Sequence, residues 1–171
     1  ILSDLRSSRA VKEVIEEAGG IAKECKVGHA NIKQQMRDES AVFAGELSGH
    51  YYFLENSYAE AGSLAALMIL SVMSETHQTA SELAHDLKRY AHSGEINSEV
   101  EDKDAVLKKL EEHYHDGRIS HLDGIKIDFP DWWFNVRPSN TEPLLRLNLE
   151  ANTQELMEKK RDEVLAIIRE K

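Results

Sequence analysis

Three polar side chains that could bind a sugar follow directly after a short apolar run. Glu46, Ser48 and His50 succeed the run 41–44, and glycines stand at positions 45 and 49. An apolar run that breaks into polar residues between glycines is typical of a strand that ends in a tight loop. A carboxylate accepts hydroxyl hydrogen bonds, a serine hydroxyl donates and accepts them, and an imidazole can move a proton near neutral pH. These groups suit a vicinal diol; the alternative is that Glu46 is a capping carboxylate and His50 a structural histidine.

A second loop holds groups that suit an anion. Residues 137–143 read Arg-Pro-Ser-Asn-Thr-Glu-Pro between two predicted strands. Arg137 offers a planar, permanently charged fork that matches a phosphate, and the hydroxyls of Ser139 and Thr141 are further donors. Because Pro, Ser, Asn and Thr are also common turn residues, an ordinary hairpin loop explains the segment equally well. On the chemistry alone, both interpretations stay open.

The composition excludes several classes of protein. The chain has 171 residues, 41% of them hydrophobic, and a formal net charge of -10, which suits one large or two small domains. Non-specific nucleic-acid binding needs a basic face, so we expect no nucleic-acid partner. The single cysteine, Cys25, excludes an internal disulfide framework. The longest apolar segment, 64–73, is too short to cross a bilayer, so we expect no membrane partner and a cytoplasmic location.

The first half of the chain alternates predicted strands and helices, which favours a largely parallel sheet. The apolar start, Ile1 to Asp4, indicates the end of a strand whose earlier residues lie upstream, so we expect a fragment of a larger protein. Apolar periodicity and stop signals then predict a helix over 10–18, a strand over 21–27, a helix over 30–37 and a strand over 41–44. The segment 58–74 is apolar nearly all round and predicts a buried helix, and a capping box at 79–82 opens a helix to about Tyr90.

The pattern changes at the polar segment 92–94, which we take as a domain boundary between residues 1–91 and 92–171. The second part is predicted to contain a strand over 95–100, a helix over 102–115, strands over 119–122, 125–129, 133–136 and 144–149, and a last helix capped by Thr153. Clean alternation in 125–129 indicates one buried and one wet face. This part is therefore expected to be α+β, with a mainly antiparallel sheet and helices on one face.

Together the two loops resemble those of the α-D-phosphohexomutase superfamily, specifically its phosphomannomutase/phosphoglucomutase group. The sugar-binding motif Gly-Glu-x-Ser-Gly-His matches residues 45–50, and the phosphate-binding motif Arg-x-Ser-Asn-Thr-x-Pro matches residues 137–143, about ninety positions later. The resemblance implies that residues 1–91 are the third domain, a truncated mixed or parallel α/β/α unit. It implies that residues 92–171 are the fourth, phosphate-binding domain.

The same resemblance assigns roles to individual residues. It implies sugar contacts by Glu46, Ser48 and Arg6, positions near the reacting centre for His50 and His29, and phosphate contacts by Arg137, Ser139, Asn140 and Thr141. Arg6 stands where the family usually has lysine, which keeps the charge but makes an acid/base role doubtful. From its surroundings alone, His29 reads more readily as an ordinary loop histidine.

The implied reaction transfers a phosphoryl group between O6 and O1 of a hexose, through a phosphoserine and a hexose 1,6-bisphosphate intermediate. The family's phosphoserine and its Mg²⁺-binding triple-Asp loop lie in earlier domains. This chain has only Asp102 and Asp104, too few ligands for that site, so we predict no metal site here. The expected partners are mannose and glucose phosphates and the missing N-terminal domains, and the fragment alone is predicted to be inactive.

Three alternatives remain at this stage. A phosphoglucosamine mutase is less favoured, because that group usually has glycine where Asn140 stands. A non-catalytic phosphosugar-binding module could have kept both loops. A pair of α/β domains without a ligand is the third.

Overall fold

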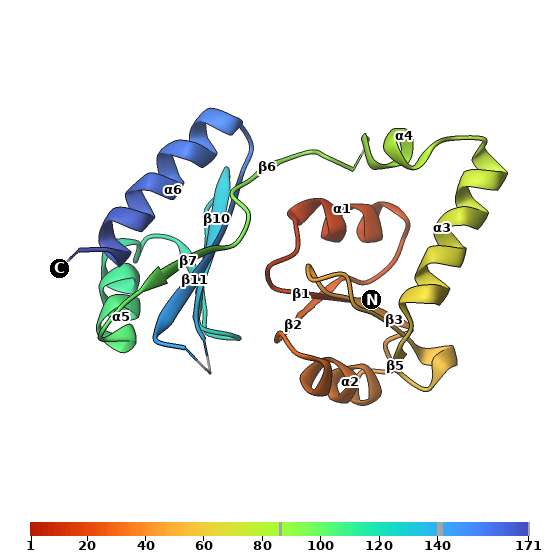
Figure 1. Cartoon of the computed structure of the whole chain (residues 1–171), viewed down its shortest axis with the longest axis horizontal. Helices are drawn as coiled ribbons and strands as arrows, with labels where there is room; N and C mark the ends of the chain where they lie inside the picture. Colours follow the sequence, from red (N-terminus) through yellow and green to blue (C-terminus); the bar gives the residue numbers. More distant parts are fainter. Residues whose placement is uncertain (86, 140–141, 171) are drawn as a thin grey trace. The chain divides into compact units, whose positions relative to one another are not determined.

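The computed structural model describes residues 1–85, 87–139 and 142–170, in two compact units (Figure 1). The first unit spans Ile1–Arg89 and the second Tyr90–Lys171, so the division falls close to the predicted boundary after Ala91. Each unit has its own apolar core, and each is described by itself below.

The described part of the first unit is built on a mixed sheet with strand order β2-β1-β3-β4-β5. Its strands are β1 (Leu2–Asp4), β2 (Lys23–Cys25), β3 (Phe43–Gly45), β4 (Tyr51–Phe53) and β5 (Ala59–Glu60). Its helices are α1 (Arg9–Glu17), α2 (His29–Asp38), the 3-10 turn η1 (Leu54–Asn56), α3 (Gly62–Thr76) and α4 (Ala80–His85). Strand β1 pairs in parallel with β2 and β3, whereas β4 and β5 pair antiparallel.

The connections of β1, β2 and β3 explain why the two faces of this sheet carry different helices. The chain moves from β1 outward to β2 through α1, then back across β1 to β3 through α2. Right-handed crossovers in opposite directions place the two helices on opposite faces, as Figure 1 shows. The α2 side is closed by Ile32 and Met36, which pack on the buried strand residues Leu2 and Ala44. Strand β1 thus ends, at Asp4, beside the loop that follows β3.

Several features of the first unit differ from the sequence predictions, among them the start of the predicted helix 58–74, where residues 59–60 form β5 and α3 begins at Gly62. The aromatic run at 51–53 forms β4, a strand that was not predicted, and α4 ends at His85 instead of near Tyr90. The prediction that the apolar helix over 58–74 is buried is wrong. Only Ala65 of α3 is buried, while Leu67 is 63% and Leu70 57% exposed. The α3 sequence is that of a helix surrounded by protein, but the described residues cover little of it.

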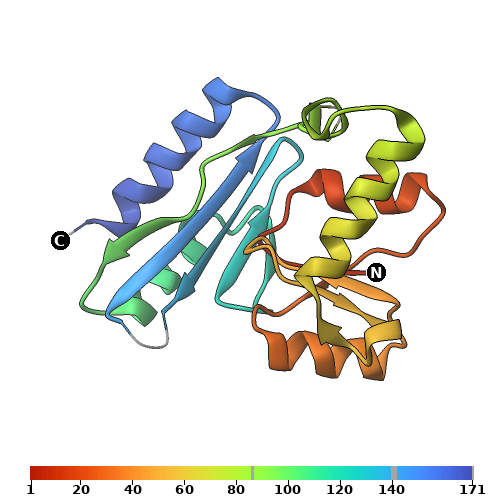
Figure 2. The same cartoon turned by 45° about the vertical axis from the view of Figure 1, so that its right-hand side comes forward.

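The second unit has an antiparallel sheet with helices on one face, as predicted (Figure 2). Its strands are β6 (Ala91–His92), β7 (Ile96–Glu99), β8 (Arg118–Ser120), β9 (Ile125–Asp128), β10 (Trp132–Pro138) and β11 (Leu144–Ala151). Its helices are α5 (Lys103–His113) and α6 (Gln154–Ile168). None of the helices described in either unit is long and apolar enough to span a membrane.

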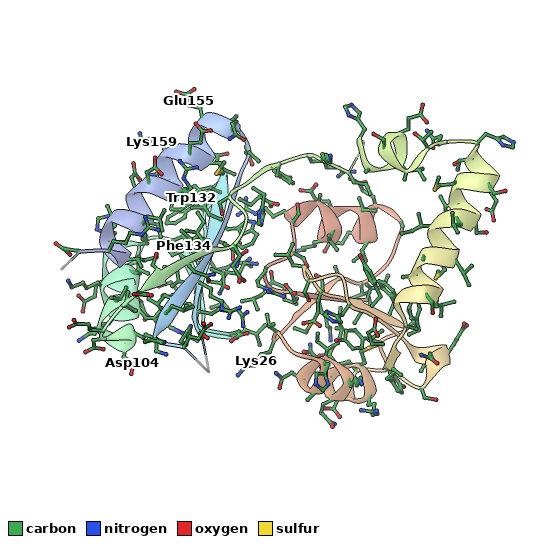
Figure 3. All side chains as sticks on the ribbon, viewed as in Figure 1. Lys26, Asp104, Trp132, Phe134, Glu155 and Lys159 are labelled. Atoms are coloured by element: carbon green, nitrogen blue, oxygen red, sulfur yellow. The ribbon has the colours of Figure 1, made fainter. Side chains whose placement is uncertain are left out.

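Alternation along β10 decides which side chains meet the helices. Trp132, Phe134 and Val136 lie in the core with Leu110 of α5 and Val164 of α6, and Figure 3 labels the first two of these between sheet and helix. The residues between them point to the opposite face. Arg137 is therefore presented on the face without helices, next to its antiparallel partner β11.

Candidate functional site

The Glu46 loop connects β3 and β4 as a tight hairpin. Gly45 pairs with Tyr51, the Glu46 amide donates to the His50 carbonyl at 2.9 Å, and the Gly49 amide donates to the Glu46 carbonyl at 2.9 Å. Gly49 has φ +83°, a conformation that favours glycine. The hairpin therefore holds Glu46, Ser48 and His50 on one short turn, as the sequence predicted.

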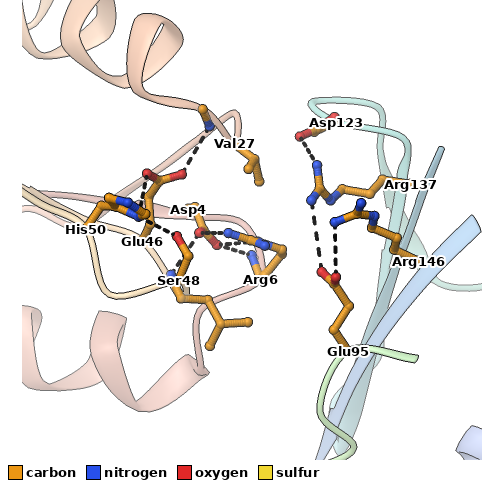
Figure 4. Close-up of polar contacts among 12 residues, drawn as sticks. Asp4, Arg6, Val27, Glu46, Ser48, His50, Glu95, Asp123, Arg137 and Arg146 are labelled. Carbon is orange, nitrogen blue, oxygen red and sulfur yellow. Dashed lines mark hydrogen bonds and ion pairs between the residues drawn. The ribbon is translucent and has the colours of Figure 1, made fainter. Parts of the chain in front are cut away.

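Glu46 is the buried anchor of this loop (Figure 4). Its Oε1 accepts from the Gly28 amide at 3.1 Å and its Oε2 from the Tyr52 hydroxyl at 2.7 Å. Burial, aided by the Glu46 carboxylate, raises the pKa of Tyr52 well above its usual value, so the hydroxyl stays a donor. Because each carboxylate oxygen has two lone pairs, Glu46 keeps acceptor capacity for a ligand hydroxyl.

A buried ion pair under the loop was not singled out from the sequence. Asp4, at the end of β1, accepts from Arg6 Nη2 at 2.7 Å and from the Arg6 amide at 2.8 Å. Its Oδ2 also accepts from the Leu47 amide at 2.9 Å, so the pair fixes the loop backbone. Arg6 was predicted to contact sugar; its side chain is largely buried against Asp4, and its contact with sugar stays a prediction. The Asp-x-Arg spacing at a strand end is the signal that could have revealed Asp4.

The other predicted site residues of the first unit, Ser48, His50 and His29, lie at the surface. Ser48 Oγ is 3.0 Å from His50 Nδ1, and that nitrogen is 3.9 Å from Glu46 Oε2, so the structure brings these three predicted residues together. His29 is the exposed first residue of α2 and follows Gly28, whose amide binds Glu46. The arrangement offers acceptors and an exposed imidazole to a hydroxylated ligand.

In the second unit, Arg137 lies beside a second guanidinium. Arg137 and Arg146 are directly opposite on β10 and β11, where like charges repel unless a counter-ion lies between them. Glu95 supplies that counter-ion, with Oε1 3.3 Å from Arg146 Nη1 and Oε2 4.0 Å from Arg137 Nη2 (Figure 4). Asp123 Oδ2 is also 4.0 Å from Arg137 Nη1. Two guanidiniums side by side are suited to a doubly charged anion such as phosphate.

The sequence analysis did not identify Arg146 and Glu95, because neither belongs to the loop motif. Arg146 lies within β11, and Glu95 directly precedes β7. Of the predicted loop residues, Ser139 is buried and its amide donates to the Leu144 carbonyl at 2.9 Å. Asn140 and Thr141 lie outside the described residues, so their predicted roles stay predictions.

The described residues do not fit a bound metal ion. Within 1–85, 87–139 and 142–170, no three His, Cys, Asp or Glu side chains gather in a metal-binding group. Asp102, half of the Asp102/Asp104 pair considered from the sequence, uses its carboxylate to cap α5. We therefore derive no step that passes through Mg²⁺ on these residues.

Comparison with a solved structure first defines the fold class. A phosphoglucomutase/phosphomannomutase family protein from Burkholderia thailandensis superposes with a TM-score of 0.82 over 98% of this chain and 36% of its own. The two are 24% identical in sequence, so this likeness concerns the fold.

Family profiles then place the chain. Residues 1–90 match "Phosphoglucomutase/phosphomannomutase, alpha/beta/alpha domain III" and residues 95–167 match "Phosphoglucomutase/phosphomannomutase, C-terminal domain". The chain belongs to the phosphoglucomutase/phosphomannomutase family, which confirms the resemblance inferred from the two loops and the fold class expected from it.

Curated relatives agree. A phosphomannomutase from Methanocaldococcus jannaschii is 48% identical over 98% of this chain, and a protein of Xanthomonas campestris named "Phosphohexose mutases" is 40% identical over 99%. An Escherichia coli K12 phosphomannomutase is 36% identical over 99%. The chain spans 37%, 39% and 38% of these relatives, respectively, and corresponds to their third and fourth domains.

Proposed function

We propose that this chain is the sugar- and phosphate-binding C-terminal part of a phosphomannomutase/phosphoglucomutase that interconverts hexose 6-phosphate and hexose 1-phosphate. The observation that carries the proposal is the chemistry of the two loops. One presents a buried, hydrogen-bonded carboxylate with a serine and a histidine. The other presents the Arg137 guanidinium, beside that of Arg146 on the neighbouring strand.

Each loop has its own task in this proposal. Glu46 accepts hydrogen bonds from sugar hydroxyls, and Ser48 accepts or donates them. Arg6 in the same unit pairs with Asp4, which in turn accepts from the Leu47 amide of the loop. His50 and His29 stand near the reacting centre. Arg137 and Ser139, with Asn140 and Thr141, bind the phosphate that is not transferred, which positions the sugar for transfer at its other end.

The transfer itself belongs to the rest of the full-length protein in this proposal. A phosphoserine in an upstream domain is the nucleophile, Mg²⁺ is bound there, and a hexose 1,6-bisphosphate is the intermediate. The protein works in the cytoplasm on mannose and glucose phosphates. Supporting the need for upstream domains, the first unit has exposed apolar side chains along α3 and a hollow of about 480 Å³ lined mainly by apolar residues, among them Val11, Phe43 and Tyr51.

A titration tests the binding part of this proposal. We expect glucose 1-phosphate to shift the NMR signals of both loops in the 171-residue chain. Arg137→Ala should weaken binding about tenfold or more, since charge-assisted hydrogen bonds to phosphate are lost. Arg118→Ala is the matched control, because Arg118 lies in the same unit with an exposed side chain paired only loosely to Asp128 at 3.4 Å.

Two results contradict the proposal. Equal affinity of the Arg137→Ala and wild-type chains would mean that the loop is a simple turn. Mutase turnover by the chain alone, with Mg²⁺ and glucose 1,6-bisphosphate added, would mean that the transferring group does not lie upstream.

A further inference from the structure

Lys103, the first residue of α5, holds two backbone carbonyls of the Arg137 loop. Its Nζ donates to the carbonyl oxygen of Ser139 at 3.0 Å and to that of Glu142 at 3.3 Å. These residues flank positions 140 and 141, so a single ammonium connects both sides of the loop. Figure 3 marks this start of α5 by the neighbouring Asp104.

The position of Lys103 is itself fixed by hydrogen bonds. Asp102 caps α5, its Oδ1 accepting from the Ala105 amide at 3.0 Å. Just before it, the Val100 amide donates to the Pro143 carbonyl at 3.2 Å, which ties the end of β7 to the same loop. Lys103 is half-buried at this junction, so its ammonium reaches the loop from a fixed base.

The stability of α5 does not explain a lysine at its first position. A cation in the first turn meets the positive end of the helix dipole, which is unfavourable. Lys108 and Lys109 stand further along α5 and pair with Glu112 and Glu170, as surface lysines commonly do. The contribution of Lys103 therefore lies in its contacts with the loop.

We propose that Lys103 is a positioning residue for the phosphate-binding loop. By holding the Ser139 and Glu142 carbonyls, it sets the loop in its binding geometry before a ligand arrives, which lowers the ordering cost of binding. The hairpin bond from the Ser139 amide to Leu144 fixes one edge of the loop, and Lys103 fixes the other. This inference rests on the proposed phosphate-binding function of Arg137.

Three variants of the 171-residue chain test it by titration with glucose 1-phosphate. Lys103→Met removes the donors and should weaken binding about five- to tenfold. Lys103→Arg keeps a charge and several N–H donors and should restore affinity to within about twofold of wild type. Lys108→Met removes an exposed charge from the same helix and should leave affinity unchanged.

A second readout separates positioning from a general loss of structure. The Leu144 amide donates to the Glu142 carbonyl at 2.9 Å, so its hydrogen exchange should quicken in Lys103→Met and return to normal in Lys103→Arg. The denaturant midpoint should stay close to that of wild type in all three variants.

Three outcomes of the titration would overturn the inference. Wild-type affinity in Lys103→Met, failed rescue by Lys103→Arg, or an equal loss in Lys108→Met would each show that the contacts with the loop do not position it. A wild-type chain that binds no glucose 1-phosphate would instead overturn the proposed function on which the inference rests.

Discussion

At the scale of single residues, two buried carboxylates, Asp4 and Glu46, organise the loop between β3 and β4 in the first unit. Neither lies alone in the protein, because Asp4 is satisfied by Arg6 and the Leu47 amide, and Glu46 by the Gly28 amide and Tyr52. A buried charge without such partners is strongly destabilising. The residues around these carboxylates therefore offset the desolvation cost of two buried charges. The Glu46 carboxylate still keeps acceptor capacity for a further hydrogen bond.

Cys25 lies in the same core and gives a residue-scale prediction about pH. It is fully buried, and burial, with the charges of Asp4 and Glu46 nearby, raises its thiol pKa from 9.0 to about 12. The unfolded chain loses this proton at lower pH than the folded chain does. The contribution of the neutral Cys25 thiol to the free energy of unfolding is therefore complete below pH 9. It is lost as pH rises from 9 toward 12, at up to about 1.4 kcal/mol per pH unit.

Denaturant unfolding of wild type and Cys25→Ala at a series of pH values isolates this effect. The stability difference between the two chains should shrink as pH rises above 9. Because Cys25 is the sole cysteine, Ellman's reagent reports on it without background, and the native thiol should react far more slowly at pH 8 than the unfolded one. A difference that does not change with pH would contradict the prediction.

At the scale of elements, the turn before β9 packs closely against β10 and brings a carboxylate to Arg137. Gly124 has φ +67°, and a Cβ there would lie 2.3 Å from the Val136 carbonyl oxygen and 2.6 Å from the Arg137 Cα. Only glycine lets this turn approach β10 so closely. The approach brings the neighbouring Asp123 carboxylate to the Arg137 guanidinium.

A pair of glycine substitutions in the second unit tests that close approach. Gly94 has a similar φ of +70° but open space around its Cβ position, so Gly94→Ala should cost about 1 kcal/mol of unfolding free energy. Gly124→Ala adds a backbone clash and should cost about 2–4 kcal/mol, measured by urea denaturation. Similar losses in both variants would show that the turn can move away from β10.

The helices and strands also show what the sequence could predict and what it could not. Strict alternation in 125–129 and the Thr153 cap predicted β9 and α6, because local patterns determine both. The run 51–53 lacks alternation, and its strand state depends on pairing with the neighbouring strands β3 and β5. The loop motifs predicted Glu46 and Arg137, whereas Arg146 and Lys103 act through register and helix placement that no local pattern encodes.

At the scale of the whole molecule, α3 carries a large exposed apolar surface. Leu67, Met68, Ile69, Leu70 and Val72 are all exposed, and they lie around the helix instead of along one stripe. Single exposed apolar residues are ordinary, but a run of them marks a surface that another part of a protein covers. Because the chain spans 37% of the M. jannaschii relative, the upstream part of the full-length protein is the cover we propose.

This surface leads to a prediction that compares the chain with the full-length protein. In the chain, Leu67→Gln combined with Leu70→Gln should lower the fluorescence of bound 8-anilinonaphthalene-1-sulfonate and change the unfolding free energy by no more than about 0.5 kcal/mol, since both side chains are already exposed. In the full-length protein the same pair should lower the thermal midpoint, because there it places two amides in an apolar contact.

Ile21→Gln is the control: Ile21 is 73% exposed but lies outside α3, so it should change neither the fluorescence nor the midpoint. A large destabilisation of the chain itself would show that α3 already packs within the first unit, and an unchanged midpoint of the full-length protein would show that nothing upstream covers it.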